Sequence, residues 1–375
     1  MLKGVNLSLM IGPVNPVPVG KDVLEALTSV SVITSTEGPS VFTLNFELSK
    51  NSPLHTLFLV SGSASIPLIR VIIAVTLNGQ TDVLIDGVMT KHDVSPGSNP
   101  NMRSLSVTGE DLTKVLDYLD LSGIPYPAMP PFARVALMIA KYAFLGIIPK
   151  VIPSVLLDVP NPLDRIPRQD GKDLAYIKRL AQEVGYVFYH EPGPTPGISF
   201  MYWGPEIKVG QPQPALNVDM DAHTNVDEIS FSFNSEMTTI PVLTIQEQTT
   251  KVPIPIPLPG VNPLSPPLGV VPPIPKNIEP YDKAAKHTVA QAIMLGLAKA
   301  AESANAVTAT GSLDVMRYGR VLKPRKLVGL RGVGHAFNGL YYVEKVTSTI
   351  KRGEFKQSFN LSRNGLISTV PRVSA

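Results

Sequence analysis

The sequence predicts an α+β fold that is mainly β, with two antiparallel β-barrels and an α/β domain inserted between them. Runs near both ends of the chain alternate apolar and polar residues, as half-buried strands do. Between these runs, apolar residues recur at helical spacing. The pairs Asp86-Gly87 and Thr108-Gly109 enclose a strand-turn-strand unit, and Asn338-Gly339 and Asn364-Gly365 enclose a similar one. This similarity indicates two related barrels, with chance likeness between hairpins as the competing explanation.

Residues 1–108 are predicted to form the first barrel. Residues 42–48 place four apolar side chains on one face, and a β-branched run over 69–77 ends at the turn pair Asn78-Gly79. Asp86-Gly87 is interpreted as a further turn. Short strands separated by Gly, Asn and Pro clusters are typical of a closed or nearly closed antiparallel barrel.

Residues 109–216 are predicted to form the α/β domain. After Asp111, one helical stripe holds the apolar residues Leu112, Val115, Leu116 and Leu119. The segment 132–145 is apolar nearly all round, which predicts a helix buried on most sides. A third helix is expected to begin at Asp173 and to end at Gly185 in a left-handed C-cap.

Residues 217–250 and 281–375 are predicted to form the second barrel, which includes an alanine-rich helix over 283–303. Residues 251–280 hold 11 prolines in 30 positions. Proline favours extended polyproline conformation and cannot donate to a sheet ladder. We therefore expect a loop or arm here, either lying along a neighbouring subunit or solvated.

The composition excludes several classes of function. With 33 basic and 30 acidic residues the net charge is +3, and no basic run is interleaved with aromatics, so we expect no nucleic acid binding. The lack of cysteine excludes disulfides and thiolate catalysis. No charge-free apolar run approaches the roughly 20 residues of a membrane-spanning helix. Prolines interrupt the apolar N-terminus, which indicates mature sequence and not a secretion signal.

An acidic segment over 217–228 partly fits a calcium-loop template, with Asp219, Asp221 and Glu228 as the weak metal candidates. Ala222 replaces the glycine that the template needs, and a strand-like run follows where a helix belongs. We therefore predict a solvated crossover, with no metal and no cofactor. The same acids together with Asp227 form the dense carboxylate group that a cell-wall-degrading enzyme would require, which is one alternative function.

Other catalytic patterns are missing from the sequence. The six histidines lie far apart without zinc-site spacing, and no nucleophile elbow or phosphate-binding loop is present. No catalytic residue is therefore predicted, and the chain is predicted not to be an enzyme. A monomeric module that binds a small ligand is a second alternative, which a molar mass near one chain would favour.

Aromatic residues supply the candidate interface positions, because large rings provide contact area. Trp203 and Tyr202 are two of them, with packing over their own turn as the alternative. The others lie in the predicted C-terminal strands and are Phe337, Tyr341, Phe355 and Phe359.

Three stretches together resemble the contractile tail hub, or late-control gene D, family. They run from Ile85 to Asp117, from Lys172 to Glu191 and from Gly334 to Gly365. The family includes phage baseplate hubs, the hub portion of VgrG spikes and the hubs of extracellular contractile injection systems. The third stretch is the most specific, because FNG, a YYV strand, a polar hairpin and the FKQSFNL strand occur in the order of the family's closing hairpin.

This resemblance implies a structural role without catalysis. In the family, each chain carries two tube-like barrels and three chains form a ring, which adapts a sixfold inner tube to a threefold spike. The implied partners are two further copies of the chain, the inner tube protein, a spike protein and other baseplate proteins. VgrG-type chains continue into the spike whereas this sequence ends at Ala375, so a separate spike polypeptide is expected.

The resemblance also implies a location. The protein is expected to be assembled in the cytoplasm of the producing cell and to become part of a virion or injection particle, including particles released outside the cell. A phage tail, a type VI system and an extracellular injection system all fit the sequence.

Overall fold

The chain is mainly β, with few helices. The computed structural model describes residues 4–49, 68–97, 102–154, 159–163, 166–234, 239–246, 253–257, 264–272, 277–280, 296 and 305–370. The alanine-rich helix predicted over 283–303 lies outside the described residues, except for residue 296. Within the described part, no helix is long and apolar enough to span a bilayer.

The largest sheet has 13 strands, ordered β12-β17-β20-β19-β3-β4-β7-β6-β5-β1-β2, with β18 on β19 and β11 on β18. Among the described strands this order is an open path and not a closed barrel. The strands are β1 (Val5–Gly12), β2 (Val17–Pro18), β3 (Leu27–Ser35), β4 (Val41–Ser49), β5 (Arg70–Leu77), β6 (Gln80–Pro96), β7 (Met102–Asp111), β11 (Gln213–Asn217), β12 (Val226–Phe233), β17 (Val307–Asp314), β18 (Leu327–Arg331), β19 (Gly339–Lys351) and β20 (Glu354–Arg363).

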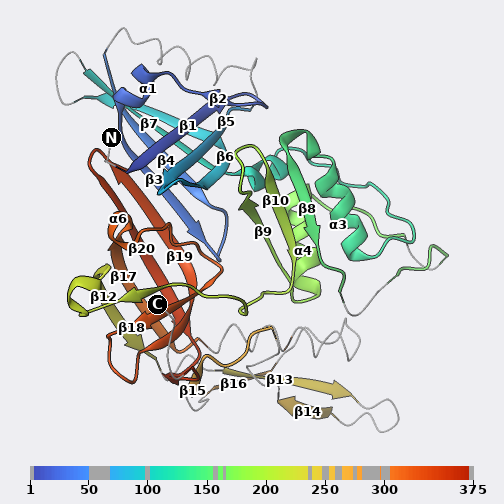
Figure 1. Cartoon of the computed structure of the whole chain (residues 1–375). Coiled ribbons are helices and arrows are strands. Elements are labelled where there is room, and N and C mark those ends of the chain that lie inside the picture. The colour runs from blue at the N-terminus through green and yellow to red at the C-terminus, as the bar shows by residue number, and fades with distance from the viewer. Residues whose placement is uncertain are drawn as a thin grey trace.

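We call β1–β7 the first β unit, and β11, β12 and β17–β20 the second β unit. In Figure 1 the first lies above the second, in blue to cyan and in yellow-green to red, and the two meet edge to edge. The junction is the antiparallel pairing of β3 with β19, from Ser35 opposite Lys345 to Ser29 opposite Lys351. Buried apolar residues of both units form one continuous core.

The alternating pattern that predicted the strands is confirmed in β4. Phe42, Leu44, Phe46 and Leu48 are each at most 2% exposed, while the residues between them reach solvent. The turn between β5 and β6 is also where the sequence predicts it, since Asn78 and Gly79 both have positive φ.

The predicted turn at Asp86-Gly87 is wrong, because both residues lie inside β6. Asp86 is fully buried and paired with Arg70 of β5. Gly87 is required by close packing, since a Cβ there would lie 2.2 Å from the carbonyl oxygen of Glu110 on β7. An Asp-Gly pair has the composition of a turn, but here each residue serves a contact between strands.

The α/β unit packs beside the β units (green in Figure 1) around its own apolar core. Its sheet has the order β8-β10-β9. Its elements are η1 (Leu112–Asp117), α3 (Pro131–Ala140), η2 (Ala143–Leu145), β8 (Ile147–Val151), α4 (Asp173–Glu183), β9 (Val187–Pro192) and β10 (Ser199–Gly204), where η marks a 3₁₀ helix.

Two of the three predicted helices of this region differ from the prediction. The first is a 3₁₀ helix that ends at Asp117, so Leu119 lies beyond it and is 60% exposed. The second ends at Ala140, and Leu137 and Phe144 are largely exposed, so it is not buried on most sides. The third, α4, begins at Asp173 as predicted, and Gly185 has the left-handed φ of a C-cap.

The proline-rich segment enters sheets, contrary to expectation. Strand β14 (Pro253–Pro257) pairs antiparallel with β13 (Thr239–Gln246), which pairs with β16 (Asn277–Pro280) on its other side. Prolines occupy every second position of β14. Since alternate residues of a strand direct their N–H groups to opposite sides, these prolines can face the edge that needs no donor.

Three short helices and a small sheet complete the described structure. The helices are α1 (Lys21–Ala26), η3 (Asp221–His223) and α6 (Val315–Tyr318). The small sheet pairs β15 (Gly269–Val271) with β21 (Leu366–Ser368). The side-chain oxygen of Asn364 accepts hydrogen bonds from the amides of Leu268 and Gly269. These bonds hold the start of β15 near the end of β20.

Candidate assembly surface

The two β units repeat one strand arrangement. The order β3-β4-β7-β6-β5 of the first unit matches β12-β17-β20-β19-β18 of the second, and every neighbouring pair in both is antiparallel. The five strands also follow one another in the same chain order. Shared order and direction indicate that the units are versions of one structure.

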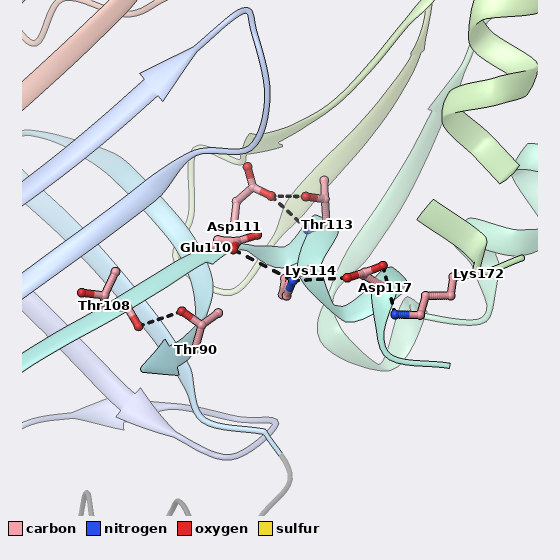
Figure 2. Close-up of polar contacts among 8 residues, drawn as sticks. All are labelled: Thr90, Thr108, Glu110, Asp111, Thr113, Lys114, Asp117 and Lys172. Carbon is pink, nitrogen blue, oxygen red and sulfur yellow. Dashed lines mark hydrogen bonds and ion pairs between the residues drawn. The ribbon is translucent and has the colours of Figure 1, made fainter. Parts of the chain in front are cut away.

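Register shifts fall at the same places in both units. The β6–β7 ladder shifts between Met89 and Lys91, and the β19–β20 ladder shifts between Val343 and Lys345. The bulged residue Thr90 donates a hydrogen bond to the carbonyl of Thr108 at 3.2 Å (Figure 2). A bulge bends and twists a strand, so repeated bulges impose the same curvature on both units.

A second pair of bulges fixes the correspondence further. The β3–β4 ladder shifts between Leu27 and Ser29, and the β12–β17 ladder between Val226 and Glu228. Aligning the bulges makes Lys91 equivalent to Lys345, and Ser31 equivalent to Ser230. Gly87 then corresponds to Tyr341, so the dipeptides that suggested a repeat in the sequence do not correspond to one another.

One face of the sheet is lined with small uncharged polar side chains, and we call it the hydroxyl face. Its residues lie opposite one another on neighbouring strands, and each is at least partly exposed. They are Ser29, Ser31, Thr43, Asn45, Ser106 and Thr108 in the first β unit, and Ser230, Thr310, Ser312, Thr347, Thr349, Ser358 and Asn360 in the second. The opposite face of the same strands forms the apolar core.

Side chains of the hydroxyl face bond to each other across strands. Asn45 donates to the hydroxyl of Ser29 at 2.9 Å, and the hydroxyls of Ser230 and Thr310 lie 2.8 Å apart. Such cross-strand pairs stabilise a sheet by roughly 0.2–1 kcal/mol each. The face therefore satisfies part of its own hydrogen bonding and leaves the remainder to water.

Two ion pairs lie near this face. Lys91 and Asp93 lie 2.8 Å apart on β6, and Lys356 lies 3.3 Å from Glu354 on β20. The pKa of Lys356 is raised, first by its hydrogen bond to Glu354. In both of these pairs, opposite charges lie next to each other on one strand.

The first β unit continues into the α/β unit through a capped 3₁₀ helix (Figure 2). The carboxylate of Asp111, the last residue of β7, accepts hydrogen bonds from the amides of Ser40 and Thr113 at 2.6 and 3.0 Å. Farther along η1, Asp117 lies 3.2 Å from Lys114 and 3.4 Å from Lys172. Asp111 thus fixes the direction in which the chain leaves the sheet.

A buried polar cluster joins the same two units. The guanidinium of Arg70 binds both oxygens of Asp86, and Asp86 also accepts a hydrogen bond from Ser199 of β10 at 2.8 Å. Arg70 donates further to the carbonyl of Gly197 at 3.2 Å. The interaction crosses from β5 and β6 into the α/β unit and requires all of these partners in place.

A cavity of about 660 Å³ lies where the two β units meet the α/β unit. Asp82 and Lys323 on its wall form an ion pair at 2.6 Å, and the guanidinium of Arg325 lies 4.0 Å from the ring centre of Tyr189. Burial raises the pKa of Tyr189 and lowers that of Arg325. These two contacts join polar groups of the wall, whereas both ring nitrogens of His190, which also lines the cavity, are buried without a hydrogen-bond partner.

Most of the aromatic interface candidates lie in the interior of their own chain. Tyr202, Trp203, Tyr341, Phe355 and Phe359 are each at most 3% exposed. Only Phe337 is partly exposed, and it stacks on Phe231 with ring centres 4.6 Å apart. Trp203 belongs to the core of the α/β unit, where its ring lies 4.9 Å from that of Tyr186.

The acidic residues of 217–228 do not converge. In the described part of the chain, no group of three His, Cys, Asp or Glu side chains is arranged to hold a metal. Asp227 lies 3.0 Å from Arg317 and 3.7 Å from Lys356, while Glu228 accepts a hydrogen bond from Ser312. Asp219 and Asp221 have positive φ, as residues of a tight crossover do.

Comparison with known proteins gives fold relatives only. No family model and no curated protein matches the sequence. Among solved structures, a tail protein from Neisseria meningitidis superposes with a TM-score of 0.62 at 12% identity, covering 97% of this chain and 98% of that one. The chain has the fold of a phage tail protein. This fold is the one that the sequence resemblance predicts, and in that respect the prediction is confirmed.

Two further structures share the tail-protein fold. The 43 kDa tail protein of prophage MuSo2 from Shewanella oneidensis has a TM-score of 0.59 at 14% identity, with 96% of this chain and 98% of that chain covered. An Escherichia coli component of the type VI secretion system has a TM-score of 0.54 at 11% identity, with 93% and 75% covered. The tail-protein fold thus extends over nearly all of this chain.

The sequence predicted the strands of the hydroxyl face but not the face itself. Serine and threonine alternate with apolar residues in β3, β4, β7 and β17, and this pattern predicts half-buried strands. A run of Ser, Thr and Asn at every second position in strands from both ends of the chain was the available signal. Only the pairing of β3 with β19 shows that these positions share one surface.

Proposed function

We propose that this chain is a structural baseplate hub of a phage tail or contractile injection system. Three copies form a ring that adapts a sixfold inner tube to a threefold spike. The hydroxyl face carries the proposal, because it extends over two versions of one strand arrangement in a chain that has the tail-protein fold.

The repeat accounts for the change of symmetry. Two similar β units in each of three chains present six similar units to a sixfold partner, while the ring as a whole keeps threefold symmetry. The two β units of a chain are not identical, because only the first carries an α/β unit. First and second units alternate around the ring, so an α/β unit occurs at every second of the six positions. The spike then meets three equivalent surfaces, as a trimeric partner requires.

The hydroxyl face suits the lining of a tube. Ser, Thr and Asn side chains hold water without the strong attraction that charged groups exert on a passing chain of either sign. In this assignment the apolar face of each sheet packs outward against the rest of the subunit. Each β unit then forms a wall segment of a tube-like barrel that other copies complete, with residues 109–216 as the inserted α/β domain.

The role is mechanical and involves no catalytic group. The partners proposed are two further copies of the chain, the inner tube protein, the spike and neighbouring baseplate proteins. The hub is assembled in the cytoplasm of the producing cell and becomes part of the particle. Asp227 forms ion pairs with Arg317 and Lys356, and we therefore do not assign it to a pair of catalytic carboxylates such as a wall-degrading enzyme would use.

Molar mass in solution and electron microscopy of the purified protein test the proposal. We expect a mass of three chains and a ring with six similar lobes around a central opening. The mass of one chain at all concentrations, also when tube and spike proteins are added, would overturn the ring. Cell-wall hydrolysis that disappears in the Asp227→Asn, Glu228→Gln variant would favour the enzyme.

A further inference from the structure

The cavity of about 660 Å³ lies at the junction of the two β units, on the side away from the hydroxyl face. Val32 of β3 and Ser348 of β19, which are buried and lie opposite each other in that junction, both line it. No residue of the hydroxyl face does so. Volumes of about 300–1,000 Å³ are typical of pockets for small molecules. The cavity therefore has the size of a ligand site, at a place to which the proposed function assigns no role.

Arg325 on the cavity wall is held in place at both ends. Its backbone has a φ of 59°, which is uncommon for a residue other than glycine, and its amide donates a hydrogen bond to the carbonyl of Val343 at 2.8 Å. Its guanidinium donates to the carbonyl of Ser35 and lies over the ring of Tyr189, 4.0 Å from the ring centre. A side chain fixed in this way loses little further freedom when it binds a ligand.

The charge of Arg325 has no carboxylate beside it. Within the described part of the chain, neither Arg325 nor the adjacent Lys326, which also lines the cavity, forms an ion pair. Burial lowers the pKa of Arg325, so water solvates its charge only in part. Charged groups removed from water are normally paired. An oxyanion in the cavity would supply the missing partner through charge-assisted hydrogen bonds.

The remaining cations of the wall lie near carboxylates. Lys323 lies 2.6 Å from Asp82, and Lys150 lies 3.9 Å from Glu191. The two adjacent cations described above therefore carry the uncompensated charge. The carboxylates of the wall would repel a ligand with several negative charges. This distribution favours a monoanion over a polyphosphate.

Apolar surface surrounds the two free cations. Tyr189 stacks on Tyr202 with ring centres 4.9 Å apart, and the hydroxyl of Tyr202 donates to the carbonyl of Pro205 at 2.7 Å, so the ring beneath the guanidinium is fixed as well. Both ring nitrogens of His190 are buried, and we assign no ligand contact to its side chain. Further apolar residues of the wall come from β6, from β10 and from the chain before β18, and they include Val83, Phe200 and Val321.

We propose that this cavity binds an organic monoanion that carries one carboxylate or similar oxyanion group on a flat apolar body. The guanidinium of Arg325 holds the oxyanion, the exposed Lys326 adds to the attraction, and the apolar wall holds the rest of the molecule. The bound molecule contacts both β units and the α/β unit, so it stabilises their arrangement. The site is formed within one chain and does not depend on the proposed ring.

Two fluorescent probes with the same rings test the site on the full chain. The first is 8-anilinonaphthalene-1-sulfonate, an aromatic monoanion, and the second is the uncharged N-phenyl-1-naphthylamine. We expect Arg325→Gln to weaken binding of the anionic probe about tenfold or more, because hydrogen bonds to a charged group are lost, and to leave binding of the uncharged probe unchanged. An anion affinity that does not change, or an equal loss for both probes, would overturn the proposal.

Arg179 supplies the matched control, because its guanidinium also lies over a tyrosine ring, 5.0 Å from the centre of Tyr176, but outside the cavity. Arg179→Gln should leave the affinities of both probes at the wild-type value. A loss of anion binding in this variant equal to that in Arg325→Gln would show that the probe reports surface charge and no site, and would overturn the proposal.

Displacement of the anionic probe by unlabelled compounds tests the ligand class. The aromatic carboxylate 1-naphthoate should displace it, whereas 1-naphthamide, which has the same rings and no charge, should require about tenfold higher concentrations. Inorganic phosphate that displaces the probe as well as 1-naphthoate does would overturn the assignment of an apolar body.

A second variant covers the case that Arg325→Gln, which also loses the contacts to Ser35 and Tyr189, does not fold. Lys326 is exposed, so Lys326→Gln should keep the wild-type midpoint of urea unfolding and weaken the anionic probe about threefold, as expected for one charge a few ångströms from the ligand in a water-exposed setting. Wild-type affinity of Lys326→Gln for the anionic probe would refute the site, and the mass and lobes of the proposed ring are measured independently of this result.

Discussion

Arg70 and Asp86 form a fully buried ion pair with two parallel hydrogen bonds of 2.8 and 2.7 Å. Their strands belong to the first β unit, but Asp86 also accepts the hydroxyl of Ser199 from the α/β unit. The pair therefore contributes both to the sheet and to the position of the neighbouring unit. Because the pair is buried, loss of either partner would leave the other as a charge without water to solvate it.

Removing one partner of this pair should destabilise the fold strongly. We expect Asp86→Ala to lower the free energy of unfolding by about 3–5 kcal/mol, because Arg70 is left charged and buried. Urea unfolding of the purified protein measures the change. Asp170→Ala breaks the exposed pair with Arg179 and should cost less than about 1 kcal/mol. Equal effects of the two variants would contradict this account.

Gly87 should tolerate no side chain. A Cβ at this position would lie 2.2 Å from the carbonyl oxygen of Glu110, so Gly87→Ala must push β6 and β7 apart. We expect a loss of about 1–3 kcal/mol, as for other overpacked sites. Gly20→Ala is the matched control, since a Cβ added at Gly20 would have no other atom within 4 Å. A neutral effect of Gly87→Ala in urea unfolding would show that the strands can separate freely.

His190 should make the fold sensitive to acid. Burial lowers its pKa, the carboxylates Asp111 and Asp86 oppose this shift, and the cations Arg70 and Arg325 add to it. The pKa of His190 is lower in the folded than in the unfolded chain, so protonation favours the unfolded chain. The free energy of unfolding is therefore independent of this group above a pH of about 6.5 and falls as the pH decreases below that value. The loss has a limiting slope of about 1.4 kcal/mol per pH unit.

The His190→Gln variant tests this dependence through urea unfolding between pH 7.5 and 5. It should reduce the slope, because the titrating group is removed. The His335→Gln variant is the control, because it removes an imidazole from the surface and leaves the interior unchanged. A wild-type stability that is independent of pH in this range would contradict the burial argument.

Glu344, the bulged residue of β19, should limit stability at neutral pH. Burial raises its pKa, and Asn305 donates a hydrogen bond to its carboxyl group at 3.2 Å. The pKa of Glu344 is higher in the folded than in the unfolded chain, so its protonated form favours folding. This contribution to the free energy of unfolding is fully present below a pH of about 4.3 and is lost as the pH rises. Glu344→Gln should therefore raise the free energy of unfolding at pH 7, by about 1.4 kcal/mol for each unit of the shift, and change it little at pH 4. A variant less stable than wild type at pH 7 would exclude this interpretation of the side chain.

The sequence by itself determined the elements whose signal is local. Alternation fixed the buried face of β4, Asn78-Gly79 fixed the turn after β5, and Gly185 fixed the end of α4. The family resemblance predicted the fold. These features depend on residues within a few positions of each other, where side-chain spacing and backbone preference act directly.

Tertiary structure alone decided the features that join distant residues. The pairing of Ser35 with Lys345 connects the β units, although the two residues lie far apart in sequence. It also decided that Asp86 serves an ion pair and no turn, and that five aromatic interface candidates fill the core. A local pattern predicts that a strand has a polar face. Which strands share that face depends on hydrogen bonds between residues far apart in sequence, so the hydroxyl face exists only in the folded chain.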